Sequence, residues 1–244
     1  MQKIKRFYKT ATAGADAGDA PGFQVLLDGR PVRTPAKAPL VVLSQPLAQA
    51  IAEEWQAQDE EVDPALMPLN SLTCTAIDIV VPQRDRIVAD LADYGGHDLI
   101  CYWTDEVGEL LGLQQQHWQP LLDWAADRFA APLLKTGGVV SQEQPAASLA
   151  ALKQAVADHQ GMALTGLAAA VQAAGSLIIG LALSHGRLDA DQAHAVSQLD
   201  DTYQARRWGE DAEAAARREN LRQELLSAER FLELLRCGEG VAAS

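Results

Sequence analysis

Cysteine is scarce in this 244-residue sequence, and the cysteines it has are far apart: Cys74, Cys101 and Cys237. None belongs to a Cys-x-x-Cys pair, so the sequence predicts neither a disulfide framework nor a cysteine zinc site. The histidines are equally dispersed, at His97, His117, His159, His185 and His194. No two of them are four residues apart, the spacing that places two metal ligands on one face of a helix. We therefore expect a reducing compartment and no bound metal.

Positive charge is also in short supply. The chain has 20 Lys and Arg against 33 Asp and Glu, which gives a formal net charge of −13. Such a chain is repelled by a phosphate backbone and by anionic lipid. The N-terminus has neither an apolar stretch of signal-peptide length nor the composition of a clear transit peptide. The sequence therefore indicates a cytoplasmic protein that binds neither nucleic acid nor a membrane.

Charge is absent altogether from residues 160–184, a stretch long enough to span a bilayer. The stretch is largely Ala and Gly, with Thr165, Gln172 and Ser176 inside it, and Ala contributes little to membrane insertion. A helix that is apolar all round is also what the centre of a helical domain requires. Between a membrane span and a buried helix we expect the buried helix, at 162–184.

The first third of the chain has the pattern of strands followed by a helix. Asp28-Gly29 lies between two short apolar runs and supplies the positive φ angles of a tight hairpin turn. A further strand in "APLVVL" stops at Ser44, a good N-cap, and the spacing of Leu47, Ile51 and Trp55 predicts a helix from there. Two shorter helices are expected at 71–81 and 84–95, the second closing at Gly95.

Beyond "HDLICYW", which reads as a buried strand or a loop, the chain has helical periodicity to its end. Helices are expected at 115–131, 148–159, 162–184, 189–207 and 209–236. The predicted fold class is α+β, with a small N-terminal antiparallel β-containing domain at 1–85 followed by an all-helical C-terminal domain at 86–244.

Catalytic patterns are few. His97 and Asp98 could form an oriented histidine, but no nucleophile lies near them in the sequence, so a turn or core histidine is favoured. No glycine-rich segment has the Gly-Lys-Ser/Thr ending of a phosphate loop. We therefore expect no catalytic residues and no cofactor.

The stretch "RRWGEDAEAAARR", from Arg206 to Arg218, interrupts the helical pattern with Trp208, Gly209, Glu210 and Asp211. Adjacent carboxylates point about 100° apart on a helix, which argues against a paired acid and base. Two interpretations stay open. In one, Trp208 is a core residue, Gly209 is a break or a cap and the acids complement the helix dipole. In the other, the same residues form a binding corner, since Trp is enriched at binding hot spots.

Several stretches together resemble a known family. "KRFYK", "GFQVLLDGRPVRTPAKAPLVV", "AIAEEWQAQ", "DPALMPLNSLTCTAID", "DLICYW", "WQPLLDWA" and "RRWGEDAEAAARR" occur in this order nearly end to end. This order is similar to that of the F-type ATP synthase assembly chaperones, called ATP synthase assembly factor two in mitochondria. One departure is Cys74, where the family pattern has asparagine before "TAID".

The resemblance implies a chaperone, not an enzyme, that binds the unassembled α subunit of the catalytic head, prevents its aggregation and hands it on to β. It implies a partner-binding motif at Trp208, Gly209, Glu210 and Asp211, with Glu210 as the charge that matters to the partner. We expect a monomer in the bacterial cytoplasm, or in the mitochondrial matrix for a eukaryotic chain. The alternatives are an enzyme that uses His97 and Asp98, and a scaffold protein that does not release its partner.

Overall fold

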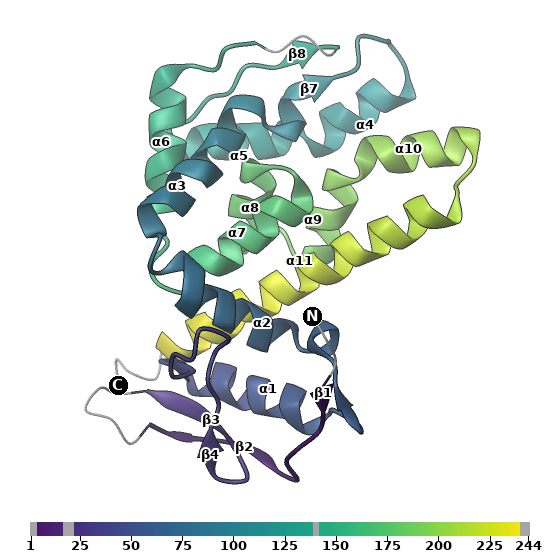
Figure 1. Ribbon diagram of the computed structural model, residues 1–244. Coiled ribbons are helices and arrows are strands. Elements are labelled where there is room, and N and C mark those ends of the chain that lie inside the picture. The colour runs from purple at the N-terminus through teal and green to yellow at the C-terminus, as the bar shows by residue number, and fades with distance from the viewer. Residues whose placement is uncertain (1–3, 17–21, 139–141, 240–244) are drawn as a thin grey trace. The chain divides into compact units, whose positions relative to one another are not determined.

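The computed structural model describes residues 4–16, 22–138 and 142–239 (Figure 1). The chain forms two compact units. The first, here called the β unit, comprises Met1–Gln83, Gly161–Gly166 and Arg230–Ser244, and the second, the helical unit, comprises Arg84–Gln160 and Leu167–Glu229. The α+β fold class is confirmed. The domain limits of 1–85 and 86–244 stay a prediction.

An antiparallel sheet of four strands forms the centre of the β unit. Strand β3 (Phe23–Leu27) pairs with β2 (Ala11–Ala15) on one side and with β4 (Arg30–Pro31) and β5 (Val41–Val42) on the other. The predicted hairpin is confirmed, with φ angles of 48° at Asp28 and 80° at Gly29. A separate antiparallel pair joins β1 (Ile4–Lys5) to β6 (Glu61–Val62).

One helix covers one face of this sheet (Figure 1). Helix α1 (Gln45–Gln56) begins at the predicted cap, where Ser44 Oγ accepts a hydrogen bond of 3.2 Å from the Leu47 backbone N–H. Its buried face packs on the inward side chains of β3, which alternate with outward ones as in any half-buried strand. The remaining elements are η1 (Pro64–Leu66), α2 (Pro68–Thr75) and the π-helical turn η2 (Ala76–Val80).

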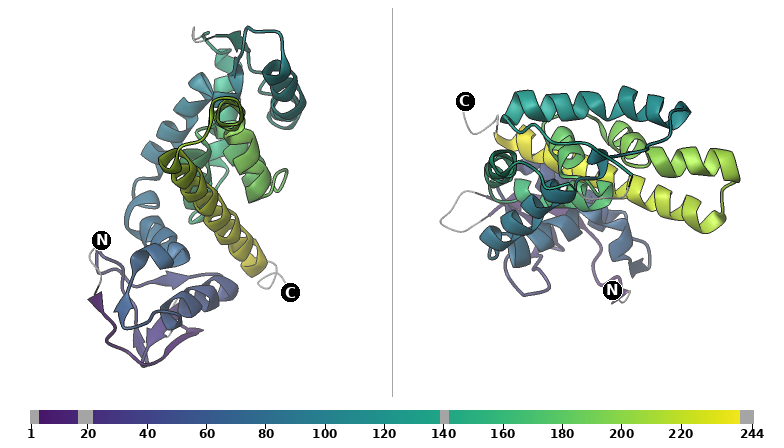
Figure 2. Two further views of the ribbon diagram at one scale, coloured as in Figure 1. Left: turned by 90° about the vertical axis from the view of Figure 1, so that its right-hand side faces the viewer. Right: turned by 90° about the horizontal axis from the view of Figure 1, so that it is seen from above.

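The helical unit starts with α3 (Arg84–Asp93) and two short 3-10 helices, η3 (Tyr94–His97) and η4 (Leu99–Cys101). It then contains one small sheet, the parallel pair of β7 (Tyr102–Trp103) and β8 (Thr136–Gly137), so the C-terminal part is not wholly helical. The longer helices are α4 (Glu109–His117), α5 (Gln119–Phe129), α6 (Ala146–Ala157), α7 (Ala163–Ala174), α8 (Leu177–Ser184), α9 (Ala190–Ser197), α10 (Leu199–Trp208) and α11 (Ala212–Glu239). Helix α11 is unbroken in each view (Figure 2).

Three helices that the periodicity predicted as single are each two helices. The 115–131 helix breaks at Trp118, because Pro120 in the first turn of α5 has no N–H to continue the ladder. The 189–207 helix breaks at Gln198, just after Ser197, whose hydroxyl donates to the His194 carbonyl.

The uncharged stretch also divides. Gly175 takes a φ of 66°, and Ser176 Oγ then caps α8 by accepting a hydrogen bond of 3.1 Å from the Ile179 N–H. Every residue of α8 from Leu177 to Leu183 is buried, as expected for a central helix. Among the helices of the described ranges, none combines the length and apolar character that crossing a bilayer requires.

Candidate functional site

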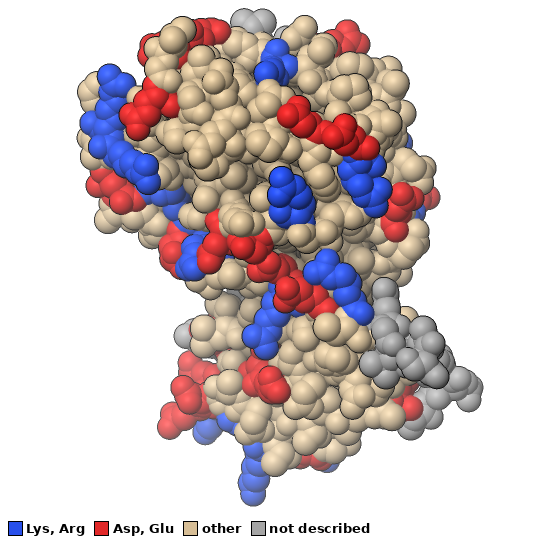
Figure 3. Space-filling view, turned by 180° about the vertical axis from the view of Figure 1, so that it is seen from behind, with Lys and Arg blue, Asp and Glu red and all other residues tan. Residues whose placement is uncertain are grey.

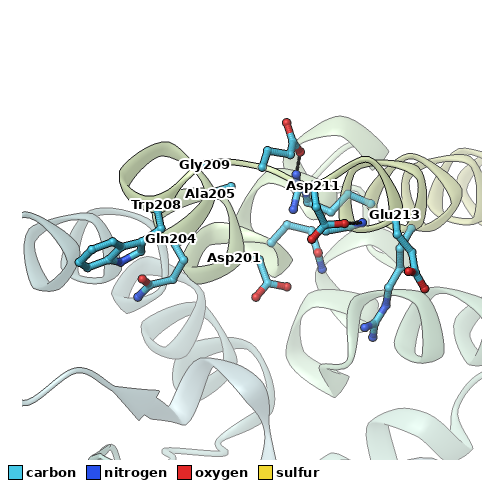
Figure 4. A pocket seen from close by; sticks show the side chains of 12 residues that line it. Asp201, Gln204, Ala205, Trp208, Gly209, Asp211 and Glu213 are labelled. Carbon is cyan, nitrogen blue, oxygen red and sulfur yellow. Dashed lines mark hydrogen bonds and ion pairs between the residues drawn. The ribbon is translucent and has the colours of Figure 1, made fainter.

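The predicted binding motif lies at a corner between two helices of the helical unit (Figure 4). Trp208 is the last residue of α10, Gly209 to Asp211 form the link, and α11 begins at Ala212. Gly209 has φ 95° and ψ 155°, a conformation that an L-residue with a Cβ rarely adopts. A glycine at this position therefore makes the turn between the helices.

The two acids of the motif have different partners. Asp211 is the helix cap, since its Oδ1 accepts a hydrogen bond of 2.8 Å from the Ala214 N–H. Gly209, interpreted from the sequence as a break or a cap, is the C-cap of α10. The Glu210 carboxylate forms an ion pair with Arg218, whose side chain is 15% exposed while that of Glu210 is 48% exposed. The charge predicted to matter most to a partner is thus already paired within the chain.

Trp208 is 77% exposed. The interpretation of Trp208 as a core residue is therefore wrong, because a core tryptophan of the kind seen at Trp118 is 1% exposed. The Arg207 guanidinium lies 5.7 Å from the Trp208 ring centroid, and it donates to the Tyr203 hydroxyl at 3.0 Å. The indole presents a large apolar surface with one hydrogen-bond donor, which is the chemistry of binding hot spots.

An open groove of about 500 Å³ lies between the end of α10 and the start of α11 (Figure 4). Its lining includes Asp201, Gln204 and Ala205 from α10, and Glu213 and Arg217 from α11. The Asp201 and Glu213 carboxylates have no ion-pair partner among the residues that the structure describes. The groove therefore offers carboxylates, amides and the edge of an indole, with no paired acid and base on a common target.

Helix α9 holds α11 at three positions between Arg218 and Glu229. The Arg222 guanidinium pairs with Asp191 at 2.7 Å, His194 Nε2 donates to the Arg218 carbonyl at 3.0 Å, and Glu229 accepts from the Ala190 N–H at 3.2 Å. These contacts reach Arg218, the partner of Glu210. One of the two helices that meet at the corner is therefore held by α9 from Arg218 onward.

The start of α10 is held by α4. The buried Gln114 amide donates to the Asp200 carboxylate at 3.1 Å, and its carbonyl accepts from the Thr104 N–H at 2.9 Å. Burial raises the pKa of the Asp200 carboxyl, and the hydrogen bond from Gln114 partly offsets this. Sequence reasoning missed Gln114 and Arg218, since a glutamine and an arginine within helices carry no local signal of their long-range partners.

His97 and Asp98 have separate environments. His97 is exposed, and its Nδ1 lies 3.4 Å from the Tyr102 hydroxyl. Asp98 is 0% exposed and accepts hydrogen bonds from Ser176 Oγ at 2.6 Å and from the Ile178 N–H at 3.0 Å. Burial raises the pKa of the Asp98 carboxyl, against the lowering by these donors. The Asp98 carboxylate thus has a structural role, since it binds the first residues of α8.

The three cysteines differ in exposure and reactivity. Burial raises the pKa of the Cys74 thiol to about 11 and that of the Cys101 thiol to about 12, so both stay protonated and unreactive at neutral pH. Cys237 is exposed. Within the described ranges, no group of three or more His, Cys, Asp or Glu side chains could hold a metal ion.

Charged side chains of both signs are interspersed on the face shown in Figure 3, among uncharged residues. The net charge of −13 means that acidic side chains outnumber basic ones in the chain as a whole. A partner attracted over a distance is therefore one with basic character.

Comparison with known proteins defines the class. A model of the ATP12 chaperone protein family matches residues 5–126, which is half of the chain. The chain belongs to the ATP12 chaperone family. The family name is that of a chaperone and not of an enzyme.

Individual relatives agree with this assignment. The chain is similar to the protein atp12, mitochondrial, of Schizosaccharomyces pombe, with 25% identity over 218 residues that cover 84% of this chain and 74% of the relative. The crystal structure of Atp12 from Paracoccus denitrificans is 44% identical, with a TM-score of 0.89 over 95% of this chain and 98% of that one. Atu1473 from Agrobacterium tumefaciens is 37% identical, with a TM-score of 0.89 over 96% and 87%. The family resemblance found in the sequence is confirmed.

Proposed function

We propose that this chain is an assembly chaperone that binds the unassembled α subunit of the F-type ATP synthase, prevents its aggregation and hands it on to β. Membership of the ATP12 chaperone family supports the general role. The ordered motifs of the sequence support the more specific one. An unassembled ring subunit exposes apolar surface meant for its neighbours, and a partner must cover that surface and later leave.

We further propose that the corner formed by Trp208, Gly209, Glu210 and Asp211 contacts the client. The observation that carries this proposal is the 77% exposure of Trp208 at the end of α10, beside the groove. An indole has only two side-chain torsions to order on binding, and truncating a tryptophan at an interface commonly costs more than about 1 kcal/mol of affinity. The carboxylates around the groove pair with Arg or Lys of the client and set its orientation.

The acidic composition suits this role. A chain with a net charge of −13 resists self-association while it presents an apolar contact. We propose that the protein acts as a monomer, in the bacterial cytoplasm or, in a eukaryote, in the mitochondrial matrix.

The test is co-expression with the α subunit, measured as the fraction of α that stays in the supernatant. Trp208→Ala is expected to lower this fraction while leaving the melting temperature of the purified chain unchanged, because an exposed side chain contributes little to folding. The matched control is Val107→Ala, since Val107 is 95% exposed in the same unit and does not line the groove. Equal protection by both variants and the wild type would remove the corner from the client interface.

A pull-down from the source cell separates the alternatives. Recovery of free α subunit supports the chaperone, recovery of intact synthase supports a non-releasing scaffold, and recovery of neither opposes both.

A further inference from the structure

Strand β2 is an edge strand, and its hydrogen-bonding pattern can be worked out residue by residue. Asp28 N–H donates to the Thr10 carbonyl at 2.9 Å, and Asp16 N–H donates to the Gly22 carbonyl at 2.8 Å. The antiparallel register pairs Thr10 with Asp28 and Asp16 with Gly22, so even-numbered residues of β2 bond to β3. The backbone groups of Ala11, Ala13 and Ala15 therefore point away from the sheet.

The beginning of this edge is already covered by a side chain that imitates a strand. The Gln56 amide accepts from the Ala11 N–H at 2.8 Å, and it donates to the Lys9 carbonyl at 3.5 Å. In a parallel sheet, the N–H and C=O of one residue likewise bond to an acceptor and a donor two residues apart on the neighbouring strand. The edge thus accepts strand-like partners where one is offered.

Beyond Gln56 the edge is open. Gln24 Nε2 donates to the Ala15 carbonyl at 3.4 Å. The outward groups left over are the Ala11 carbonyl, both groups of Ala13 and the Ala15 N–H, and no residue in the described ranges bonds to them. Four such groups match an extended segment of about three to five residues.

The usual protections of an edge strand are missing from β2. Its sequence, Ala-Thr-Ala-Gly-Ala, has no charge, no proline and no bulky side chain. Natural proteins blunt an exposed edge with lysine, proline or a bulge, because an open edge recruits other strands. An edge left open in a protein that binds other chains fits a docking surface.

We propose that the β2 edge binds an extended segment of the client by strand addition, in which main-chain hydrogen bonds supply the affinity. The inference rests on the proposed function for the client's identity. The segment has no proline at the paired positions and carries neutral or basic side chains, because the chain has a net charge of −13. The same charge disfavours a second copy of this chain as the occupant, since two such chains repel each other.

The test uses prolines at the outward positions. In Ala13→Pro/Ala15→Pro, the lost N–H groups bond to nothing within the sheet, and proline is tolerated on edge strands whose N–H faces solvent. The matched control, Ala13→Ser/Ala15→Ser, keeps both N–H groups. We expect the amount of α subunit that co-purifies to fall about tenfold in the proline variant and to stay at the wild-type level in the control.

Amide hydrogen exchange of the wild type gives a second readout that requires no substitution. The Ala13 and Ala15 amides are expected to exchange rapidly in the free chain and slowly in the complex with α. The Thr12 and Gly14 amides, which bond to β3, serve as internal standards because they exchange slowly in both. If the proline variant fails to fold, this measurement alone tests whether the client pairs with β2.

The outcomes separate this inference from the proposed function. A wild-type chain that binds no α subunit overturns the proposed function. A wild-type chain that binds α, with Ala13 and Ala15 exchanging as fast in the complex as in the free chain, overturns strand addition alone. Light scattering that shows a wild-type dimer turned into a monomer by the prolines assigns the edge to a second copy and also overturns it.

Discussion

Two places in the helical unit have the same local chemistry, a carboxylate near the start of a helix, and opposite surroundings. Near the start of α8, Asp98 is fully buried and its oxygens accept from Ser176 Oγ and the Ile178 N–H. At the start of α11, Asp211 is exposed and accepts from the Ala214 N–H. In the sequence, only Asp211 belongs to a predicted helix start, whereas Asp98 lies in a segment that reads as a strand or a loop.

Burial decides what each carboxylate can do. The Asp98 oxygens are taken up by internal donors and water is excluded, so no partner can reach them. The corner that contains Asp211 keeps its carboxylates and the Trp208 indole accessible. The comparison shows that an acid near a helix start is a candidate for contact with a partner only where the fold leaves it exposed to solvent.

The largest loss of stability is expected from Ile178→Arg, a substitution beside the buried carboxylate of Asp98. Ile178 is fully buried beside the Asp98 cap, and an unpaired charge there should cost more than about 4 kcal/mol and unfold the helical unit. Circular dichroism measures the loss of helix, and thermal unfolding measures the loss of stability. Ile178→Val, with an expected loss of about 0.5–1.5 kcal/mol, is the control. A variant with an arginine at 178 that melts like the wild type would contradict the burial of α8.

The second prediction sets the two caps against each other. Asp98→Ala leaves three buried donors, the Ser176 hydroxyl and the N–H groups of Ile100 and Ile178, without their acceptor and should cost about 2–5 kcal/mol. Asp211→Ala removes an exposed cap and should cost about 0.5–2 kcal/mol. Asp98→Asn should fall between them, because its amide oxygen can still accept. Urea unfolding of the three variants checks the order, and equal losses at both caps would remove the distinction that burial makes.

The smallest effect is expected at Glu210. Its ion pair with Arg218 is half-exposed, so Glu210→Gln should cost about 0.2–1 kcal/mol and less at high salt. The double variant with Arg218→Gln measures the coupling between the two side chains. A loss above about 2 kcal/mol would show that the pair is structural, in the manner of Asp98, and would weaken its assignment to the client contact.

Local chemistry made much of the fold predictable. The hairpin at Asp28-Gly29 and the cap at Ser44 depend on residues adjacent in sequence, and both were confirmed. The helix breaks at Trp118 and Gln198 were missed because the apolar periodicity continues across them. The break at Gly175 had a local signal, a glycine followed by a serine that can cap, which the apolar pattern outweighed.

At the candidate site, the sequence located the interruption but not its geometry. Gly209 marked the corner, as its positive φ requires. The exposure of Trp208 depends on which face of α10 packs against α4, and the partner of Glu210 lies eight residues further along the chain. Such facts follow from tertiary packing, which periodicity does not encode.

The β unit combines segments that are far apart in the sequence, since the end of α11 belongs to it together with the strands that precede residue 83. Phe231, from the end of α11, is fully buried in the core of that unit, and the Leu234 carbonyl accepts a hydrogen bond of 2.5 Å from Ser44 Oγ. A nascent chain released as far as residue 83 therefore lacks part of its own core. On the ribosome, the strands of the β unit must wait for the end of α11 to emerge, so this unit is complete only after the helical unit has been synthesised.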